Sequence, residues 1–191
     1  MVNFNSRLKD TRLHKFLLIG LFFSLVASCS GEKIDNGQVF RMPISNEPPT
    51  LDWSLATDSV SFDILTNIME GLTQYDSNME PVPAIAKRWV ISKNGKTITY
   101  YLRDDVFWTD GQLVTAYDFE YSWKRLLNPA TAAQYAYFLF DVENAQEFNS
   151  GKISDPSKVG VSAKTAHILE VRLKKPVVYF PSITTFMVTF P

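Results

Sequence analysis

Residues 100–129, YYLRDDVFWTDGQLVTAYDFEYSWKRLLNP, do more than any other stretch to define the fold. They begin inside a run of β-branched and aromatic residues, Thr97–Leu102, which predicts a strand. Asp110-Gly111 then predicts a turn, and Ala116–Leu127 has the apolar spacing of a helix. A strand, a turn-rich loop and an amphipathic helix therefore follow one another directly.

The predicted helix carries its own start and stop signals. Thr115 is followed three residues later by Asp118, a variant of the N-terminal capping box in which Glu or Gln is usual. Asn128-Pro129 predicts the end of the helix, because proline disfavours helical geometry at the residue before it. The face expected to pack on a core consists of Phe119, Trp123 and Leu126.

A hairpin is predicted just before this stretch. Trp89–Ile91 and Thr97–Leu102 are two β-forming runs, and Lys93-Asn94-Gly95-Lys96 joins them. Asn-Gly between such runs is a strong signal for a tight hairpin turn. Upstream of the hairpin, Ala84–Arg88 predicts a short helix.

The rest of the chain predicts alternating short elements. A helix is expected from Asp58 or Ser59 to Glu70, with Gly71 at the position that follows a helix end. The other expected elements are a strand at Val39–Ile44, a partly helical segment at Tyr135–Phe148, strands at Val159–Ser162 and His167–Leu173, and a helix from Tyr179 towards Phe186. The predicted class is α/β (mixed α+β), with a mixed sheet, a hairpin and flanking helices.

The aspartates beside Phe107 and Trp108 raise the question of catalysis. A calcium loop would need alternating oxygen ligands and a distal glutamate, and none follows at the required spacing. A glycosidase pair drawn from Asp104, Asp105 and Asp110 stays open as an alternative. The favoured interpretation makes the aspartates strand-end and turn residues, and the two aromatic rings core residues.

Other catalytic arrangements find little support in the sequence. His167 is the only histidine downstream of residue 14, and Cys29 is the only cysteine, so zinc sites and Cys/His pairs are not expected. No G-x-S-x-G turn or glycine-rich phosphate loop occurs. A net charge of −1 gives no support to nucleic-acid binding. We therefore expect a binding protein without a metal or cofactor, and not an enzyme.

The N-terminus predicts export and lipid attachment. Basic residues precede an apolar run, Phe16–Val26, which is shorter than the about 20 residues that a membrane-spanning helix needs. Leu25–Cys29 resembles the bacterial lipobox, so residues 1–28 are expected to be a lipoprotein signal peptide and Cys29 the lipidated residue. Residues 29–38 are polar and predict a tether, which places the protein outside the cytoplasm, in the periplasm or at the cell surface.

Several motifs in fixed order resemble the peptide-binding branch of family 5 of the bacterial extracellular solute-binding proteins, which serve ABC importers. They are Asn46–Asp52, Met69–Leu72, Pro83–Trp89, the stretch 100–129, and Gly160-Val161 through Glu170-Val171 to Tyr179-Phe180. The resemblance covers essentially all of residues 39–190.

The resemblance implies a two-lobed fold that closes around a peptide, and ABC permease and ATPase subunits as partners. It assigns residues 39–69 to the start of the first lobe, 70–187 to a small inserted domain and 188–191 to a return to the first lobe. Matching positions make Thr57, Ser59 and Tyr135 candidate peptide-binding residues, with a packed aromatic as the alternative for Tyr135.

Members of the family are roughly three times as long as this chain. The resemblance therefore predicts an N-terminal portion that binds peptides weakly or not at all by itself. Two alternatives stay open: a surface lipoprotein that uses this domain to contact another protein, and a carrier for dipeptides, nickel or haem within the same family.

Overall fold

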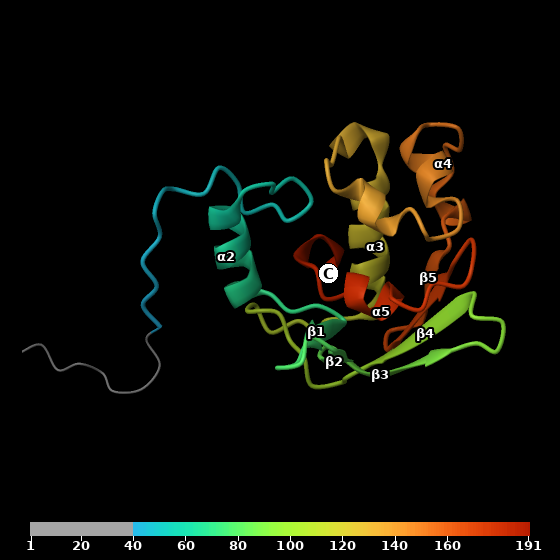
Figure 1. Cartoon of the computed structure of the whole chain (residues 1–191), viewed down its shortest axis with the longest axis horizontal. Helices are drawn as coiled ribbons and strands as arrows, with labels where there is room; N and C mark the ends of the chain where they lie inside the picture. Colours follow the sequence, from blue (N-terminus) through green and yellow to red (C-terminus); the bar gives the residue numbers. More distant parts are fainter. Residues whose placement is uncertain (1–39) are drawn as a thin grey trace, which may run out of the picture. The chain divides into compact units, whose positions relative to one another are not determined.

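The computed structural model describes residues 40–191 and divides the chain into two units, Met1–Pro43 and Ile44–Pro191 (Figure 1). The predictions for residues 1–28, for the tether 29–38 and for Cys29 lie outside the described residues.

A four-stranded antiparallel sheet forms the centre of this unit. Its order is β3-β4-β6-β5, with β3 at Ala86–Ile91, β4 at Thr97–Leu102, β6 at Ile168–Arg172 and β5 at Val161–Thr165. Tyr100 of β4 pairs with Trp89 on one side and Leu169 on the other, which fixes the register of the three neighbouring strands. The turn between β3 and β4 contains Gly95 at φ +69°, a left-handed conformation that glycine adopts without a steric penalty.

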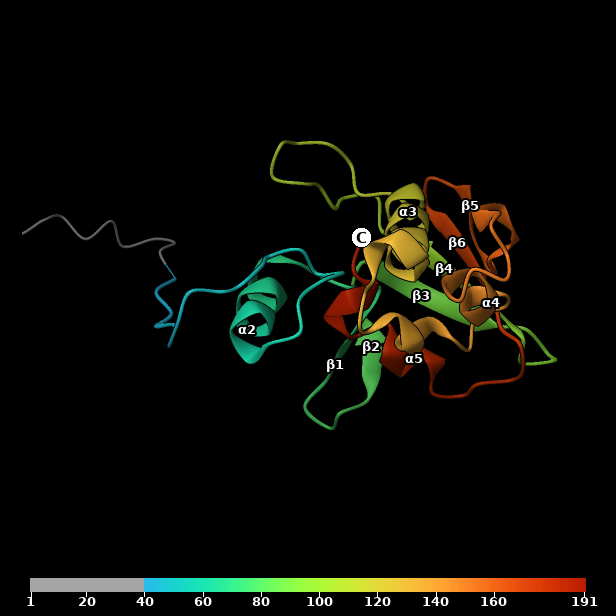
Figure 2. The same cartoon turned by 90° about the horizontal axis from the view of Figure 1, so that it is seen from above.

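Helix α3, Ala116–Leu127, covers one face of the sheet (Figures 1 and 2). The buried side chains of β4 alternate with half-buried ones, as expected for a strand with one face on a core. Helix α4, Ala145–Asn149, packs beside α3 over the same face. The main core between sheet and helices includes Ile98, Tyr100, Leu102, Phe119, Trp123, Leu126, Leu169 and Val171.

A second, smaller core joins the beginning and the end of the unit. Helix α2, Ser59–Ile68, contributes Leu65, and the preceding loop contributes Ala56. They pack with Met187 and Phe190 around the short 3-10 helix η4, Met187–Thr189. The first and last described segments are therefore held together by apolar contacts.

Short elements connect these parts. A two-stranded antiparallel sheet, β1 Thr73–Tyr75 with β2 Pro81–Pro83, follows α2. The others are η1 Pro129–Thr131, η2 Ala136–Leu139, η3 Pro156–Lys158 and α5 Phe180–Ile183. Within residues 40–191, no helix is both long enough and apolar enough to cross a membrane.

The mixed α/β class is confirmed. The predicted mixed sheet is wrong, because every strand pair within residues 40–191 is antiparallel. The hairpin at Asn94-Gly95 and helix α3 are also confirmed. The Asp118 carboxylate accepts hydrogen bonds from the Thr115 backbone N–H at 2.7 Å and its hydroxyl at 2.8 Å, so aspartate fills the role that the capping box usually gives to glutamate.

Two predicted elements are wrong. Residues 40–44 form no strand, and Val39 lies outside the described residues. The predicted helix at Ala84–Arg88 is instead a bend that leads into β3. The N–H groups of Ile85 and Ala86 donate to the carbonyls of Gly71 and Leu72, respectively, both at 3.0 Å, so long-range pairing overrides the local helix preference.

Gly71 is needed for space and does not end the helix in a left-handed conformation. Helix α2 ends at the extended C-cap residue Met69, and Gly71 is absent from the positive-φ glycines among the described residues. A Cβ on Gly71 would lie 2.6 Å from the Phe190 ring and 2.7 Å from the Thr184 carbonyl oxygen. Glycine therefore allows the two segments to approach each other closely.

Candidate functional site

The predicted binding residues Thr57 and Ser59 flank the start of helix α2. Between them, Asp58 caps the helix by accepting hydrogen bonds from the Ser61 backbone N–H at 2.9 Å and the Ser61 hydroxyl at 2.7 Å. These bonds lower the pKa of Asp58, the backbone one foremost. Thr57 and Ser59 are exposed, and their side chains make no hydrogen bond to any residue in the range 40–191. Their hydroxyls are therefore free to bind a ligand.

An ion pair fixes the loop that carries these residues to helix α3. Arg125 Nη1 donates to Asp52 Oδ1 at 2.8 Å, and Arg125 Nη2 pairs with the second carboxylate oxygen. This two-point hydrogen bond is the main reason that the pKa of Asp52 lies below its ordinary value. Both side chains are about one-third exposed, so the pair is partly shielded from water.

A chain of hydrogen bonds runs parallel to the ion pair. Trp53 Nε1 donates to the Ser122 hydroxyl at 3.1 Å, and that hydroxyl donates to the Phe190 carbonyl at 2.5 Å. Trp123 Nε1 donates to the Thr189 carbonyl at 2.7 Å. Helix α3 thus holds both the loop before α2 and the segment that ends at Pro191.

Tyr135 lies in an aromatic cluster. Its ring centre is 5.9 Å from that of Phe62 on α2, 5.9 Å from Phe186 and 5.8 Å from Phe138. The exposed ring of Tyr137 stacks on Phe138 at 4.7 Å. Tyr135 is half-buried, and its hydroxyl has no hydrogen-bond partner among residues 40–191. Its ring serves packing, and its hydroxyl is left available.

Helix α2 connects the three predicted residues. Ser59 begins the helix, Phe62 lies one turn further on, and Tyr135 packs on Phe62. Thr57, Ser59 and Tyr135 line neither of two grooves found in the described part of the chain.

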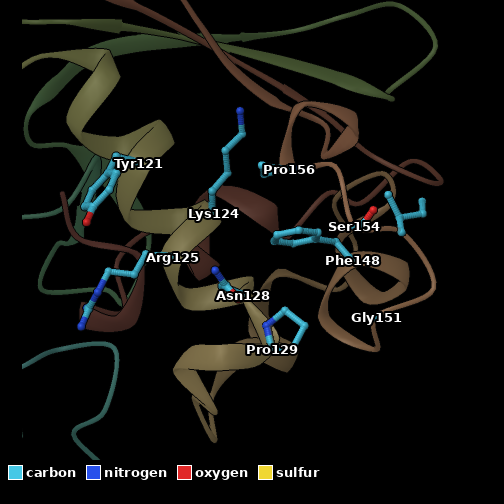
Figure 3. Close-up of a pocket in the computed structure, with 10 residues that line it drawn as sticks. Tyr121, Lys124, Arg125, Asn128, Pro129, Phe148, Gly151, Ser154 and Pro156 are labelled. Atoms are coloured by element: carbon cyan, nitrogen blue, oxygen red, sulfur yellow. The ribbon is translucent and has the colours of Figure 1, made fainter.

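The two grooves lie elsewhere. One, of about 570 Å³, runs between α3 and the segment 148–156 (Figure 3). Phe148 points towards α3 across it, whereas Arg125 points away from Phe148 on the other side of the helix. Lys124 and Arg125 border this groove, and they pair with Glu120 and Asp52, respectively. Neither residue therefore gives the groove an unpaired positive charge.

The second groove, of about 460 Å³, lies between the end of α2, the loop after β4 and Pro191. Phe107 and Trp108 both line it. The prediction that Phe107 packs in the core is wrong, because its side chain is 60% exposed, whereas Trp108 is partly buried against the main core. Phe107 follows the sharp turn after β4 on a loop that projects from the sheet.

Asp104, Asp105 and Asp110 of this loop are all exposed. Asp105 is exposed and accepts a 2.9 Å hydrogen bond from Arg103, which lowers the pKa of Asp105. A general acid requires the opposite change. Asp110 is also exposed and accepts from the Gln112 backbone N–H at 2.9 Å, as a turn residue does.

Two features of this site were missed by the sequence analysis. Asp52 and Arg125 are 73 residues apart, and no local pattern predicts that they pair. The aromatic cluster brings together residues from α2, η2 and the segment before η4. Such contacts between distant segments depend on the tertiary fold and have no periodic signal in the sequence.

Among residues 40–191, no three His, Cys, Asp or Glu side chains converge in a way that could hold a metal ion. His167 lies half-buried in the turn between β5 and β6, with its Nδ1 buried and without a hydrogen-bond partner.

Residues 80–191 match the model of the bacterial extracellular solute-binding proteins, family 5 Middle. The match covers more than half of the chain, so the chain belongs to the family 5 solute-binding proteins.

Several curated relatives have names that specify peptide ligands. The dipeptide-binding protein DppE of Bacillus subtilis is 38% identical over 186 residues, which cover 92% of this chain and 34% of the relative. The oligopeptide-binding protein OppA of the same organism is 38% identical over 182 residues, with 90% and 33% coverage. The chain spans about a third of the length of these relatives.

Solved structures agree with this assignment. The substrate-binding domain of an oligopeptide ABC transporter from Bacillus anthracis superimposes with a TM-score of 0.78 at 41% identity, over 84% of this chain and 31% of that one. Listeria monocytogenes OppA bound to peptide gives a TM-score of 0.72 at 35% identity, over 75% of this chain and 28% of that one.

Proposed function

We propose that this chain takes part in peptide import as the substrate-binding lipoprotein component of an ABC transporter, and that it resembles the oligopeptide-binding members. The observation that carries the proposal is the match of residues 80–191 to the family model. The names of several relatives support peptides as the ligand class, since they specify dipeptides, oligopeptides and a murein peptide. ABC permease and ATPase subunits are the partners that this function needs.

The proposed contacts with peptide come from Thr57, Ser59 and Tyr135. The hydroxyls of all three residues have no partner within residues 40–191, so each could bond to a peptide backbone. Extended peptides are often held through their backbone groups, in the way that an added strand is held in a sheet. This mode depends little on the peptide sequence.

We further propose that these residues form one wall of the site. Thr57 and Ser59 are exposed, and none of the three residues lines either of the two grooves described above. A ligand on an open wall keeps much of its surface in water and gains little from desolvation. The 191-residue chain by itself is therefore expected to bind peptides with a Kd on the order of millimolar, unless a second polypeptide covers the wall.

The proposed domain boundaries follow the same division. Residues 39–69 and 188–191 would belong to a first lobe, and residues 70–187 to an inserted domain. The small core that unites Ala56, Leu65, Met187 and Phe190 supports this arrangement, because it joins the two ends of the unit. Lipid attachment at Cys29, after removal of residues 1–28, would keep the protein outside the cytoplasm at the membrane surface.

Saturation-transfer NMR with a mixture of tripeptides tests this proposal, because it detects millimolar affinity. We expect transfer to the peptides from the wild-type chain, and about threefold to tenfold weaker binding for Tyr135→Leu. Tyr121→Leu is the matched control, since Tyr121 is an exposed tyrosine of α3 outside the aromatic cluster. Equal signals from both variants and the wild type would contradict the proposed site, and micromolar binding would contradict the open wall.

A further inference from the structure

One end of the sheet presents four lysines on two adjoining segments. Lys93 and Lys96 belong to the turn between β3 and β4, and Lys174 and Lys175 follow β6. The Leu173 N–H donates to the Lys96 carbonyl at 2.8 Å, and Pro176 lies against Gly95. We call this surface, residues 92–97 and 174–179, the lysine end.

Two acidic groups face the lysine end. Glu147 of α4 pairs with Lys174 at 3.3 Å, and Asp141 accepts a 2.8 Å hydrogen bond from the neutral Tyr179 hydroxyl and keeps its negative charge. Lys93, Lys96 and Lys175 are exposed and form no ion pair with any residue in the described range. The lysine end therefore carries positive charge that the described part of the chain does not neutralise.

Apolar side chains project from the same surface. Val178 is 89% exposed and Tyr179 is 57% exposed, and only the buried Val177 separates them from Lys174-Lys175-Pro176. The next residue, Phe180, is buried in the main core and fixes the segment at its base. A protruding valine costs free energy in water and regains it only in an apolar environment.

We propose that the lysine end docks on the surface of an anionic phospholipid bilayer. Lysine ammonium groups are attracted to anionic headgroups, by about fivefold in affinity for each lysine near the surface. Val178 would enter the boundary between headgroups and acyl chains, and Tyr179 would lie at headgroup level, where aromatic rings with a polar tip are favoured. A nucleic acid would satisfy the lysines but would leave Val178 in water.

The experiment mixes lipid vesicles with the full chain that carries Cys29→Ser, so that no lipid anchor holds the protein on the bilayer and a cysteine introduced elsewhere can carry a polarity-sensitive dye. The dye is placed at Val178→Cys and, as the control, at Thr109→Cys on the exposed loop after β4. Vesicles contain phosphatidylcholine alone or with phosphatidylglycerol, and spin-labelled lipids quench dyes that touch the bilayer.

We expect quenching of the dye at position 178 on anionic vesicles, little quenching on phosphatidylcholine, and little at position 109 on either. Combining Lys93→Gln, Lys96→Gln and Lys175→Gln should abolish the quenching at 178, as should high salt. Equal quenching at both positions, or quenching independent of phosphatidylglycerol, would overturn the proposal. Its outcome does not depend on whether the chain binds peptides.

Discussion

At the scale of single residues, the Asp52–Arg125 pair connects the candidate binding loop with the main fold. The pair holds the turn in which the Asp52 carbonyl accepts hydrogen bonds from the N–H groups of Leu55 and Ala56, just before Thr57. A charged pair that is partly shielded from water is stronger than an exposed one. Because it keeps some contact with water, it does not carry the full free-energy cost of removing both charges from water. It is therefore a good probe of how firmly the loop is held.

Asp52→Asn should lower the free energy of unfolding by about 1 kcal/mol at pH 7. Arg125 lowers the pKa of Asp52 in the folded chain, so this stabilisation is present above the unfolded pKa of about 4 and is lost as the pH falls through the folded pKa. Urea unfolding followed by tryptophan fluorescence should show that the difference in unfolding free energy between the wild type and Asp52→Asn becomes smaller below about pH 4.

The control is Asp105→Asn, which removes the more exposed Arg103–Asp105 pair and should change stability very little. If both variants lose the same unfolding free energy at pH 7, the Asp52–Arg125 pair stabilises the fold no more than the exposed Arg103–Asp105 pair does.

A second residue-scale prediction concerns Gly71. Gly71→Ala would place a methyl group 2.6 Å from the Phe190 ring and 2.7 Å from the Thr184 carbonyl oxygen. We expect a loss of about 1–3 kcal/mol of stability, because tightly packed segments would have to move apart. Thermal unfolding should detect it, with Thr109→Ala on the exposed loop as a neutral control; an unchanged Tm for both would mean that this contact relaxes easily.

Sequence patterns describe single residues well only where the role is local. The turn role of Asp110 was predicted from its neighbours, and Trp108 packs against the main core as expected. The exposure of Phe107 was not predicted, because a large apolar residue next to Trp108 looks the same in sequence whether it faces the core or a groove.

At the scale of elements, local signals were reliable where several agreed. Helix α3 has a capping box, an apolar face and a proline stop, and its bounds match the prediction. The segment 84–88 has helix-favouring composition but no cap, and the carbonyls of Gly71 and Leu72 recruit its backbone for sheet-like pairing. Agreement between independent signals, more than propensity, decided which elements could be predicted.

Asp118→Ala should test the cap of α3 directly. The substitution removes both hydrogen bonds to Thr115 and should cost about 1 kcal/mol of stability. Asp118→Glu should retain most of the stability, since glutamate is the usual residue of this motif. Asp104→Ala, at an exposed position after β4, serves as the control in urea unfolding; if it costs as much as Asp118→Ala, the cap contributes nothing specific.

At the scale of the whole unit, the described residues pack around two cores of unequal size. The larger contains the sheet and α3, and the smaller contains α2, the loop before it and η4. The sequence predicted the mixed α/β class, and the order of its motifs predicted the family. It could not predict the small core, which joins residues more than 120 positions apart. That core also places Phe62 against Tyr135 through α2.

The unequal cores predict unequal local stability. Helix α2 rests on a few apolar contacts, so its amide hydrogens should exchange faster than those of β4 and β6 at the centre of the sheet. Hydrogen exchange followed by mass spectrometry can compare peptides from residues 59–68 and 97–102. Equal protection in both would mean that the unit opens as one cooperative block.

The central claim is that this chain presents a peptide-binding wall at Thr57, Ser59 and Tyr135. Photo-crosslinking with a short peptide that carries a benzophenone side chain tests it most directly, because covalent capture records even weak contacts and mass spectrometry locates them. We predict crosslinks in residues 56–62 and around Tyr135, which excess unlabelled peptide removes. Crosslinks confined to the groove between α3 and residues 148–156, or scattered without competition, would contradict the claim.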